Sequence, residues 1–137
     1  MVKLNEFTFA LMNEKYYTPR IEDIRVGYEY ESLQKQQDGT EKWIPNKIIR
    51  KYDLEADWEG WLYYNIIRVP YLTREQVESE GWKYNGNTFE KNRCRLDFVA
   101  SEEHCELSID DMHDSYLFQG TINSVNEFRT LIKWLGI

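Results

Sequence analysis

The chain's few soft metal ligands are close together in sequence. Its only cysteines and histidines are Cys94, His104, Cys105 and His113, and the chemistry they suggest is a zinc site. Their spacing, Cys-x9-His-Cys-x7-His, lacks the close Cys-Cys and His-His pairs from which zinc sites are usually built. We therefore expect no metal and no other cofactor, and we interpret the two cysteines as small core side chains.

The strands expected around these cysteines support that interpretation. Residues 93–100 and 105–111 each alternate apolar and polar side chains, which predicts two antiparallel strands joined by a four-residue loop. In that hairpin Cys94 lies three residue pairs from Cys105, on the order of 20 Å away. This separation is too large for a disulfide or a shared metal. The predicted register pairs Ala100 with Cys105, Phe98 with Leu107, and Leu96 with Ile109.

Acid–base chemistry has one candidate location, the segment 110–115. Asp111, His113 and Asp114 lie there within four residues, but neighbours in a loop do not make a catalytic triad, which needs defined roles and geometry. The chain contains no G-x-S-x-G, no glycine-rich phosphate loop and no H-E-x-x-H. We expect a protein that is not an enzyme; the alternative is a small hydrolase or nucleotide-binding enzyme that uses this loop.

Segregated negative charge is the clearest chemical signal. The chain holds 17 Lys and Arg against 24 Asp and Glu, a net charge of −7. Between Leu96 and Phe128 there are eight acids and no Lys or Arg, so the rest of the chain is nearly neutral. The predicted register places several of these acids on the outward face of the hairpin. The candidate partner-binding residues are Asp97, Glu102, Glu103, Glu106, Asp110, Asp111 and Asp114.

An acidic face of this kind predicts a basic protein partner. It would steer association with a positive surface and compete with nucleic acid for a basic groove. The net charge argues against direct binding to nucleic acid, and no D-x-[DN]-x-[DN]-G calcium loop is present. The alternative interpretation is a solvated outer sheet face that discourages aggregation through strand edges.

Aromatic side chains form a second group. Trp58, Trp61, Tyr63, Tyr64 and Tyr71 cluster in sequence; they suggest either a stacking platform for bases or core packing, and we favour the core. Trp134, on the flank of the last predicted helix, is either a contact residue or a helix edge packed on a sheet.

The elements that must position these side chains indicate an α+β fold, an antiparallel β-sheet with hairpins and two short helices at about 73–80 and 125–135. Both helices begin at capping-box sequences, Thr73 to Gln76 and Ser124 to Glu127. Asp38-Gly39 and Asn85-Gly86 predict tight hairpin turns. The apolar run Trp61–Val69 predicts a central strand. Pro45-Asn46 is expected to interrupt the strand after the first turn.

Composition and length bound the organisation of the chain. With 137 residues, 42% hydrophobic and 15% aromatic, we expect a single domain over 1–137, within which 1–68 forms a β-rich half and 69–137 an α+β half. No run approaches the roughly 18 apolar residues of a membrane span, and the first residues lack a secretory pattern. Few cysteines and no leader indicate the cytoplasm.

Three separated segments resemble a family of small accessory proteins from Bacteroidetes phages and integrated elements. That family shows an "R(I/V)G" strand, an "(I/V)PLT–helix–GF" unit and a "VHQLQNLY-LTG"-like final helix, and the resemblance covers about a third of the chain. Tyr71 interrupts the Pro-Leu-Thr run, and Asn126-Glu127 replaces His-Gln. The matching positions are Arg25, Val26, Gly27, Val69, Pro70, Leu72, Thr73, Gly81, Trp82, Val125, Phe128, Leu131, Leu135 and Gly136.

The resemblance implies an origin rather than a chemistry. The family has no assigned chemistry, so no functional residue is carried over. Together with the acidic segment it suggests a phage-encoded inhibitor of a bacterial nucleic-acid-handling defence machine, of the anti-CRISPR type, acting in the host cytoplasm. A self-associating phage accessory protein is a further alternative, and the oligomeric state stays open.

Overall fold

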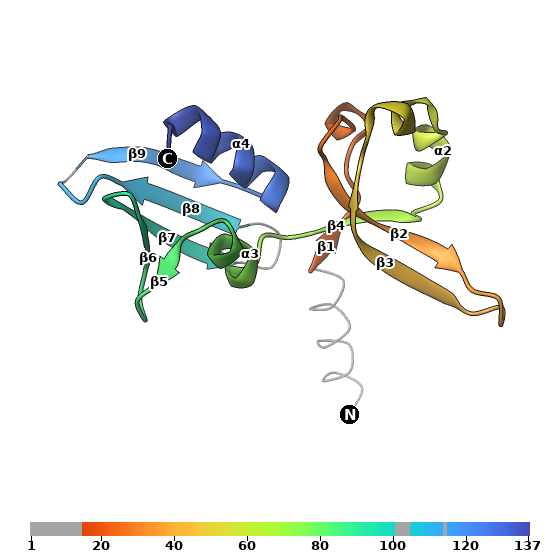
Figure 1. Ribbon diagram of the computed structural model, residues 1–137, viewed down its shortest axis with the longest axis horizontal. Helices are drawn as coiled ribbons and strands as arrows, with labels where there is room; N and C mark the ends of the chain where they lie inside the picture. The colour runs from red at the N-terminus through yellow and green to blue at the C-terminus, as the bar shows by residue number, and fades with distance from the viewer. Residues whose placement is uncertain (1–14, 101–104, 114) are drawn as a thin grey trace. The chain divides into compact units, whose positions relative to one another are not determined.

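The chain divides into two compact units, the first ending at Pro70 and the second beginning at Tyr71. Figure 1 shows the computed structural model, which describes residues 15–100, 105–113 and 115–137. Each unit has its own hydrophobic core and its own antiparallel sheet. The predicted α+β class with hairpins and short helices is confirmed.

The first unit is a four-stranded sheet with a helix and two 3-10 turns. The turn at Asp38-Gly39 joins two neighbouring strands, as predicted, and Gly39 adopts the positive φ of +89° that the turn requires. The strand order is β1 (Tyr16–Tyr17), β4 (Ile67–Pro70), β2 (Glu29–Lys35), β3 (Glu41–Ile48). The 3-10 turns are η1 (Ile21–Asp23) and η2 (Lys51–Glu55).

The expected interruption at Pro45-Asn46 is a β-bulge. Tyr30 pairs with Lys47 and Ser32 with Ile44, so two residues of β3 lie opposite the single residue Glu31. Asn46 takes a left-handed conformation with φ of 58°. Because β3 is an edge strand, the proline removes no hydrogen bond from the ladder's interior, and the strand continues past it.

The prediction of a strand over Trp61–Val69 is wrong for its first half. Residues Trp58–Tyr63 form helix α2, and only Ile67–Pro70 form strand β4. The helix begins because the Asp57 carboxylate accepts a hydrogen bond from the Gly60 N–H at 3.2 Å, a cap that outweighs the β-propensity of the aromatic side chains. Asn65, with φ of 56°, then turns the chain into β4.

Helix α2 supplies the centre of the first core. Trp58 is buried, stacks edge-on against Tyr30 with ring centroids 5.2 Å apart, and donates its indole N–H to the Asp53 carbonyl at 2.7 Å. Ile67 and Val69 of β4 are buried beside it. Full burial of side chains this large contributes about 1.5–3 kcal/mol each, so the helix is held by its apolar face rather than by its six residues' intrinsic helicity.

The second unit is a five-stranded antiparallel sheet with both helices packed into its core. The Asn85-Gly86 turn joins the first two strands, as predicted. The strands, in spatial order, are β5 (Lys83–Tyr84), β6 (Phe89–Lys91), β7 (Cys94–Ala100), β8 (Cys105–Asp110) and β9 (Tyr116–Thr121). The helices are α3 (Arg74–Ser79) and α4 (Val125–Leu135).

The predicted helix caps are present, with one difference. Thr73 Oγ1 accepts from the Gln76 N–H at 3.2 Å while the Gln76 side chain accepts from the Thr73 N–H at 3.0 Å, a complete capping box. Ser124 caps α4, but the Glu127 carboxylate reaches one residue further back, to the Asn123 N–H at 3.1 Å. No helix in the described ranges is long and apolar enough to cross a membrane.

The apolar stripe of α4 closes the second core against one face of the sheet (Figure 1). Phe128 is fully buried and lies 6.3 Å, centroid to centroid, from the ring of Trp82. Gly136 ends the helix in a left-handed conformation with φ of 72°. The stripe predicted from sequence, Val125, Phe128, Leu131, Ile132 and Leu135, is the side of α4 that packs on the core.

The Thr73 cap gives a test of the second unit's helix α3. We expect Thr73→Ala to lower the free energy of unfolding by about 1 kcal/mol, because the Gln76 N–H loses its acceptor. Thr73→Ser keeps the oxygen and should stay within a few tenths of a kcal/mol of the parent. Urea unfolding followed by circular dichroism measures both; equal stability of the alanine and serine variants would contradict the capping role.

Candidate functional site

The register of β7 and β8 decides which side chains share a face of the second sheet. Leu96, Leu107 and Ile109 are buried against the helices, so Asp97 and Glu106, which alternate with them, lie on the opposite face. The predicted pairs Ala100–Cys105, Phe98–Leu107 and Leu96–Ile109 are all confirmed. The outward position of Asp97 and Glu106 follows from that register.

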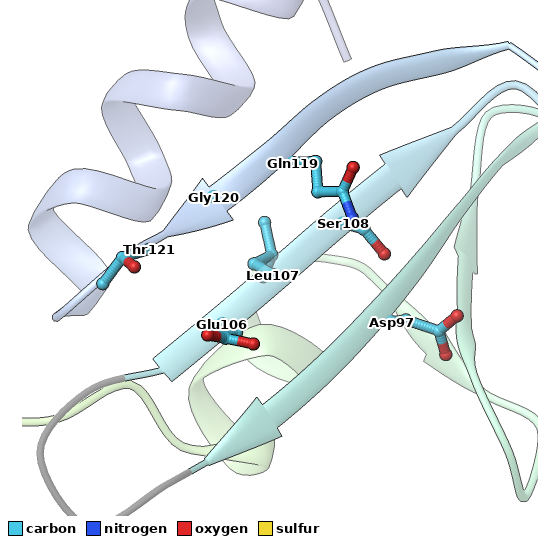
Figure 2. A pocket seen from close by; sticks show the side chains of 7 residues that line it. All are labelled: Asp97, Glu106, Leu107, Ser108, Gln119, Gly120 and Thr121. Atoms are coloured by element: carbon cyan, nitrogen blue, oxygen red, sulfur yellow. The ribbon is translucent and has the colours of Figure 1, made fainter.

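Polar side chains of three neighbouring strands meet on this face. Figure 2 shows Asp97 from β7, Glu106 and Ser108 from β8, and Gln119 and Thr121 from β9. In the register Asp97 lies opposite Ser108, and Ser108 lies opposite Gln119. We call these five residues the acidic sheet face. They line an open hollow of about 290 Å³.

Two carboxylates dominate the acidic sheet face. Asp97 and Glu106 are both exposed and occupy diagonal positions on adjacent strands, a relation that separates side chains by roughly 7–8 Å. Ser108, Gln119 and Thr121 add hydroxyl and amide groups that can donate or accept hydrogen bonds. The face is therefore suited to cationic, hydrogen-bonding side chains rather than to an apolar ligand.

The Asp110 carboxylate is paired with a basic side chain across the strands. Its Oδ2 accepts from Arg95 Nη2 at 3.2 Å and from Arg95 Nε at 3.3 Å, across the β7–β8 pair. Its Oδ1 accepts from the backbone N–H of Met112 at 2.9 Å. The Asp110 side chain is only 15% exposed, so this acid stabilises the end of the hairpin more than it offers charge to a partner.

Asp111 closes the loop between β8 and β9. Its Oδ1 accepts from the backbone N–H of His113 at 2.8 Å and of Ser115 at 3.2 Å. The His113 hydrogen bond, helped by that of Ser115, lowers the pKa of the Asp111 carboxyl. The segment proposed as an acid–base loop thus uses this oxygen to hold its own backbone, an arrangement typical of an Asx turn.

The remaining predicted partner-binding residues lie outside the described residues. These are Glu102 and Glu103, which follow β7 in the sequence, and Asp114, which follows β8. His104 lies outside them as well.

The two cysteines lie at opposite ends of the hairpin and both are buried as free thiols. Burial raises the pKa of Cys105 to about 11, and the thiol contacts the Leu72 carbonyl at 3.5 Å. Burial, with the nearby charges of Asp111 and Asp110, also raises the pKa of Cys94. Among the described residues, no group of three or more His, Cys, Asp or Glu is placed to hold a metal ion.

The aromatic group divides between core and surface. Trp58 and Trp61 pack into the first core, and Tyr71 packs against the second. Tyr63 and Tyr64 are 78% and 72% exposed, respectively, and stack edge-on against each other. Trp134 is 81% exposed, so it does not pack its ring on the sheet.

Sequence reasoning missed the neutral half of the acidic sheet face. Ser108, Gln119 and Thr121 carry no charge and were not singled out, yet they line the hollow with the two acids. The alternation of the segment 116–122 was the available signal. Once its pairing with β8 is known, Gln119 and Thr121 must share a face with Ser108 and Glu106.

The buried thiols give a chemical test of the hairpin. At pH 8 a pKa of about 11 leaves only roughly one in a thousand Cys105 side chains as thiolate. We expect Cys105, assayed alone in a Cys94→Ser variant, to react with a disulfide reagent only after unfolding in guanidinium. Reaction of the native protein at the rate of a free thiol would contradict its buried position.

Asp111 gives a test by pH. Its folded pKa lies below the ordinary 3.8, so its stabilisation of the loop is present above pH 3.8 and is lost as the pH falls through the lower folded value. We expect the His113 and Ser115 amide NMR signals to shift in that range. Asp111→Asn keeps an acceptor oxygen but does not titrate, so the same signals should lose this pH dependence; an unchanged titration would contradict the assignment.

Comparisons of the chain with protein-family models, with curated proteins and with solved structures find no match.

Proposed function

We propose that this is a non-enzymatic binding protein that presents its acidic sheet face to a basic surface of a partner protein. The observation that carries the proposal is the separation of charge, eight acids and no Lys or Arg between Leu96 and Phe128. Asp97 and Glu106 stand within that segment on an open, exposed face.

The acids contribute unequally to the proposed contact. Asp97 and Glu106 are the central contacts, because both side chains are exposed and line the open hollow of the acidic sheet face. Glu102, Glu103 and Asp114 add negative charge to the same segment in sequence and contribute to long-range attraction. Such attraction raises the association rate of oppositely charged proteins and weakens as salt is added.

The chemistry of the partner follows from the likeness between carboxylates on a sheet and the phosphates of nucleic acid, since both present negatively charged oxygens. A groove that binds nucleic-acid phosphates is lined with Lys and Arg, and carboxylates on a sheet can occupy it in place of phosphates. A bacterial nucleic-acid-handling effector is such a partner, and its occupation would inhibit it. The resemblance to phage accessory proteins supports a defence effector as the partner. It also supports an anti-CRISPR-like role for this protein and its action in the bacterial cytoplasm.

Charge reversal tests the proposal. Tagged protein is used to capture partners from nuclease-treated bacterial lysate, beside an Asp97→Lys/Glu106→Lys variant. We expect a dominant basic, nucleic-acid-binding partner whose affinity falls at least about tenfold in the variant, since close charge pairs at interfaces are worth several kcal/mol. Added nucleic acid should displace the protein from that partner.

A matched control separates the face from net charge alone. Glu41→Lys/Glu55→Lys makes the same change in charge at two exposed acids of the first unit, and it should leave capture intact. Equal loss of partner capture in both variants would mean that the overall charge of the protein, and not the acidic sheet face, determines binding. A partner indifferent to Asp97→Lys/Glu106→Lys would overturn the proposed contact.

A further inference from the structure

A second polar site lies in the first unit, on the sheet face opposite its core. Ile67 and Val69 of β4 point into the core, so Arg68 between them lies on the other face. Its guanidinium carbon lies 3.6 Å from the ring centroid of Tyr16 on β1 and 4.1 Å from that of Trp43 on β3. Arg68 thus reaches across β2 and is stacked on two aromatic rings.

A hydrogen bond to one carboxylate fixes the orientation of the Arg68 guanidinium between the two rings. Arg68 Nε donates to Glu31 Oε1 at 2.8 Å, and the two residues are direct partners across β4 and β2. The side chains are only 24% and 13% exposed, respectively. Within the described part of the chain, the two terminal amino groups of Arg68 have no hydrogen-bond acceptor. Four N–H donors are therefore held in place without an acceptor among the residues that the structure describes.

Arg68 also lines a hollow of about 210 Å³. The same hollow is lined by Thr18, Trp43 and Asn65, whose hydroxyl, indole N–H and side-chain amide also have no hydrogen-bond partner among the described residues. The polar groups around it are thus rich in donors. A ligand that supplies acceptor oxygens would satisfy donors already oriented by stacking, which lowers the entropic cost of binding.

We propose that this hollow binds a carboxylate, held by the two terminal amino groups of Arg68. The planar guanidinium fork matches the spacing of two carboxylate oxygens. Glu31 already balances part of the Arg68 charge, so a monoanion suits the site better than a phosphate dianion. The aromatic side chains of Tyr16 and Trp43 suit a flat or apolar group attached to the carboxylate.

Binding is measured by NMR with three simple anions. Sodium acetate is titrated against the full-length protein while the Trp43 indole signal and the Arg68 side-chain signals are followed, with chloride at equal ionic strength as reference. Saturable shifts with acetate and none with chloride are expected, and inorganic phosphate at neutral pH should bind more weakly than acetate. Equal, unsaturating shifts for acetate and chloride would overturn the proposal, and tighter phosphate binding would overturn the carboxylate assignment.

Variants with opposite expected effects separate a change in acetate binding from a failure to fold. Glu31→Gln keeps the acceptor for Arg68 Nε but removes the competing negative charge, so acetate should bind several-fold to roughly tenfold more tightly. Arg68→Lys keeps the charge but loses the fork and should weaken binding by a similar factor. Arg95→Lys, at the exposed Arg95–Asp110 pair, should leave acetate binding unchanged. No tightening in Glu31→Gln would contradict the site, even if Arg68→Lys failed to fold.

Discussion

Alternation along the β7–β8 hairpin is the constraint on which the second unit depends. Successive side chains of a strand point to opposite faces, so Leu96, Leu107 and Ile109 face the helices while Asp97 and Glu106 face water. A slip of one residue would exchange the two sets, burying carboxylates at a cost of several kcal/mol each. The same alternation therefore builds a core that α4 can close and a surface that carries the acids.

The acids at the end of this hairpin stabilise the fold of the sheet itself. Asp110 is matched by Arg95, and Asp111 is matched by the amides of its own loop. Both stabilise the turn into β9 and so help to hold Gln119 and Thr121 beside β8. The number of acids in the sequence therefore overstates the negative charge that this end of the sheet presents to solvent.

The two cross-strand ion pairs, Arg68–Glu31 and Arg95–Asp110, illustrate how surroundings change the same chemistry. Both join an arginine to a carboxylate on the neighbouring strand. Arg95 is about half exposed and uses two nitrogens on Asp110, which is the arrangement of a surface pair with a modest contribution to stability. Arg68 is covered by two rings and uses one nitrogen on Glu31, which leaves its terminal donors for another acceptor.

The sequence by itself determined the features that depend on near neighbours. The Thr73 cap, the Asn85-Gly86 turn, the β7–β8 register and the stripe of α4 all rest on contacts within a few residues or across one short loop. These were predictable because capping, turn chemistry and alternation act locally. The outward position of Asp97 and Glu106 came with them.

Tertiary structure alone decided the features that join distant segments. Asp57 caps the start of helix α2, but residues Trp58–Tyr63 stay helical because their apolar side packs in one core with Tyr30 and Ile67, which come from other segments of the chain. The two rings around Arg68 come from distant segments: Tyr16 on β1 lies 52 residues before Arg68 in the chain, and Trp43 on β3 lies 25 residues before it. Local patterns predict the neighbours that a hairpin joins but not pairings such as β1 with β4 or β4 with β2, since those depend on the burial that the whole unit achieves.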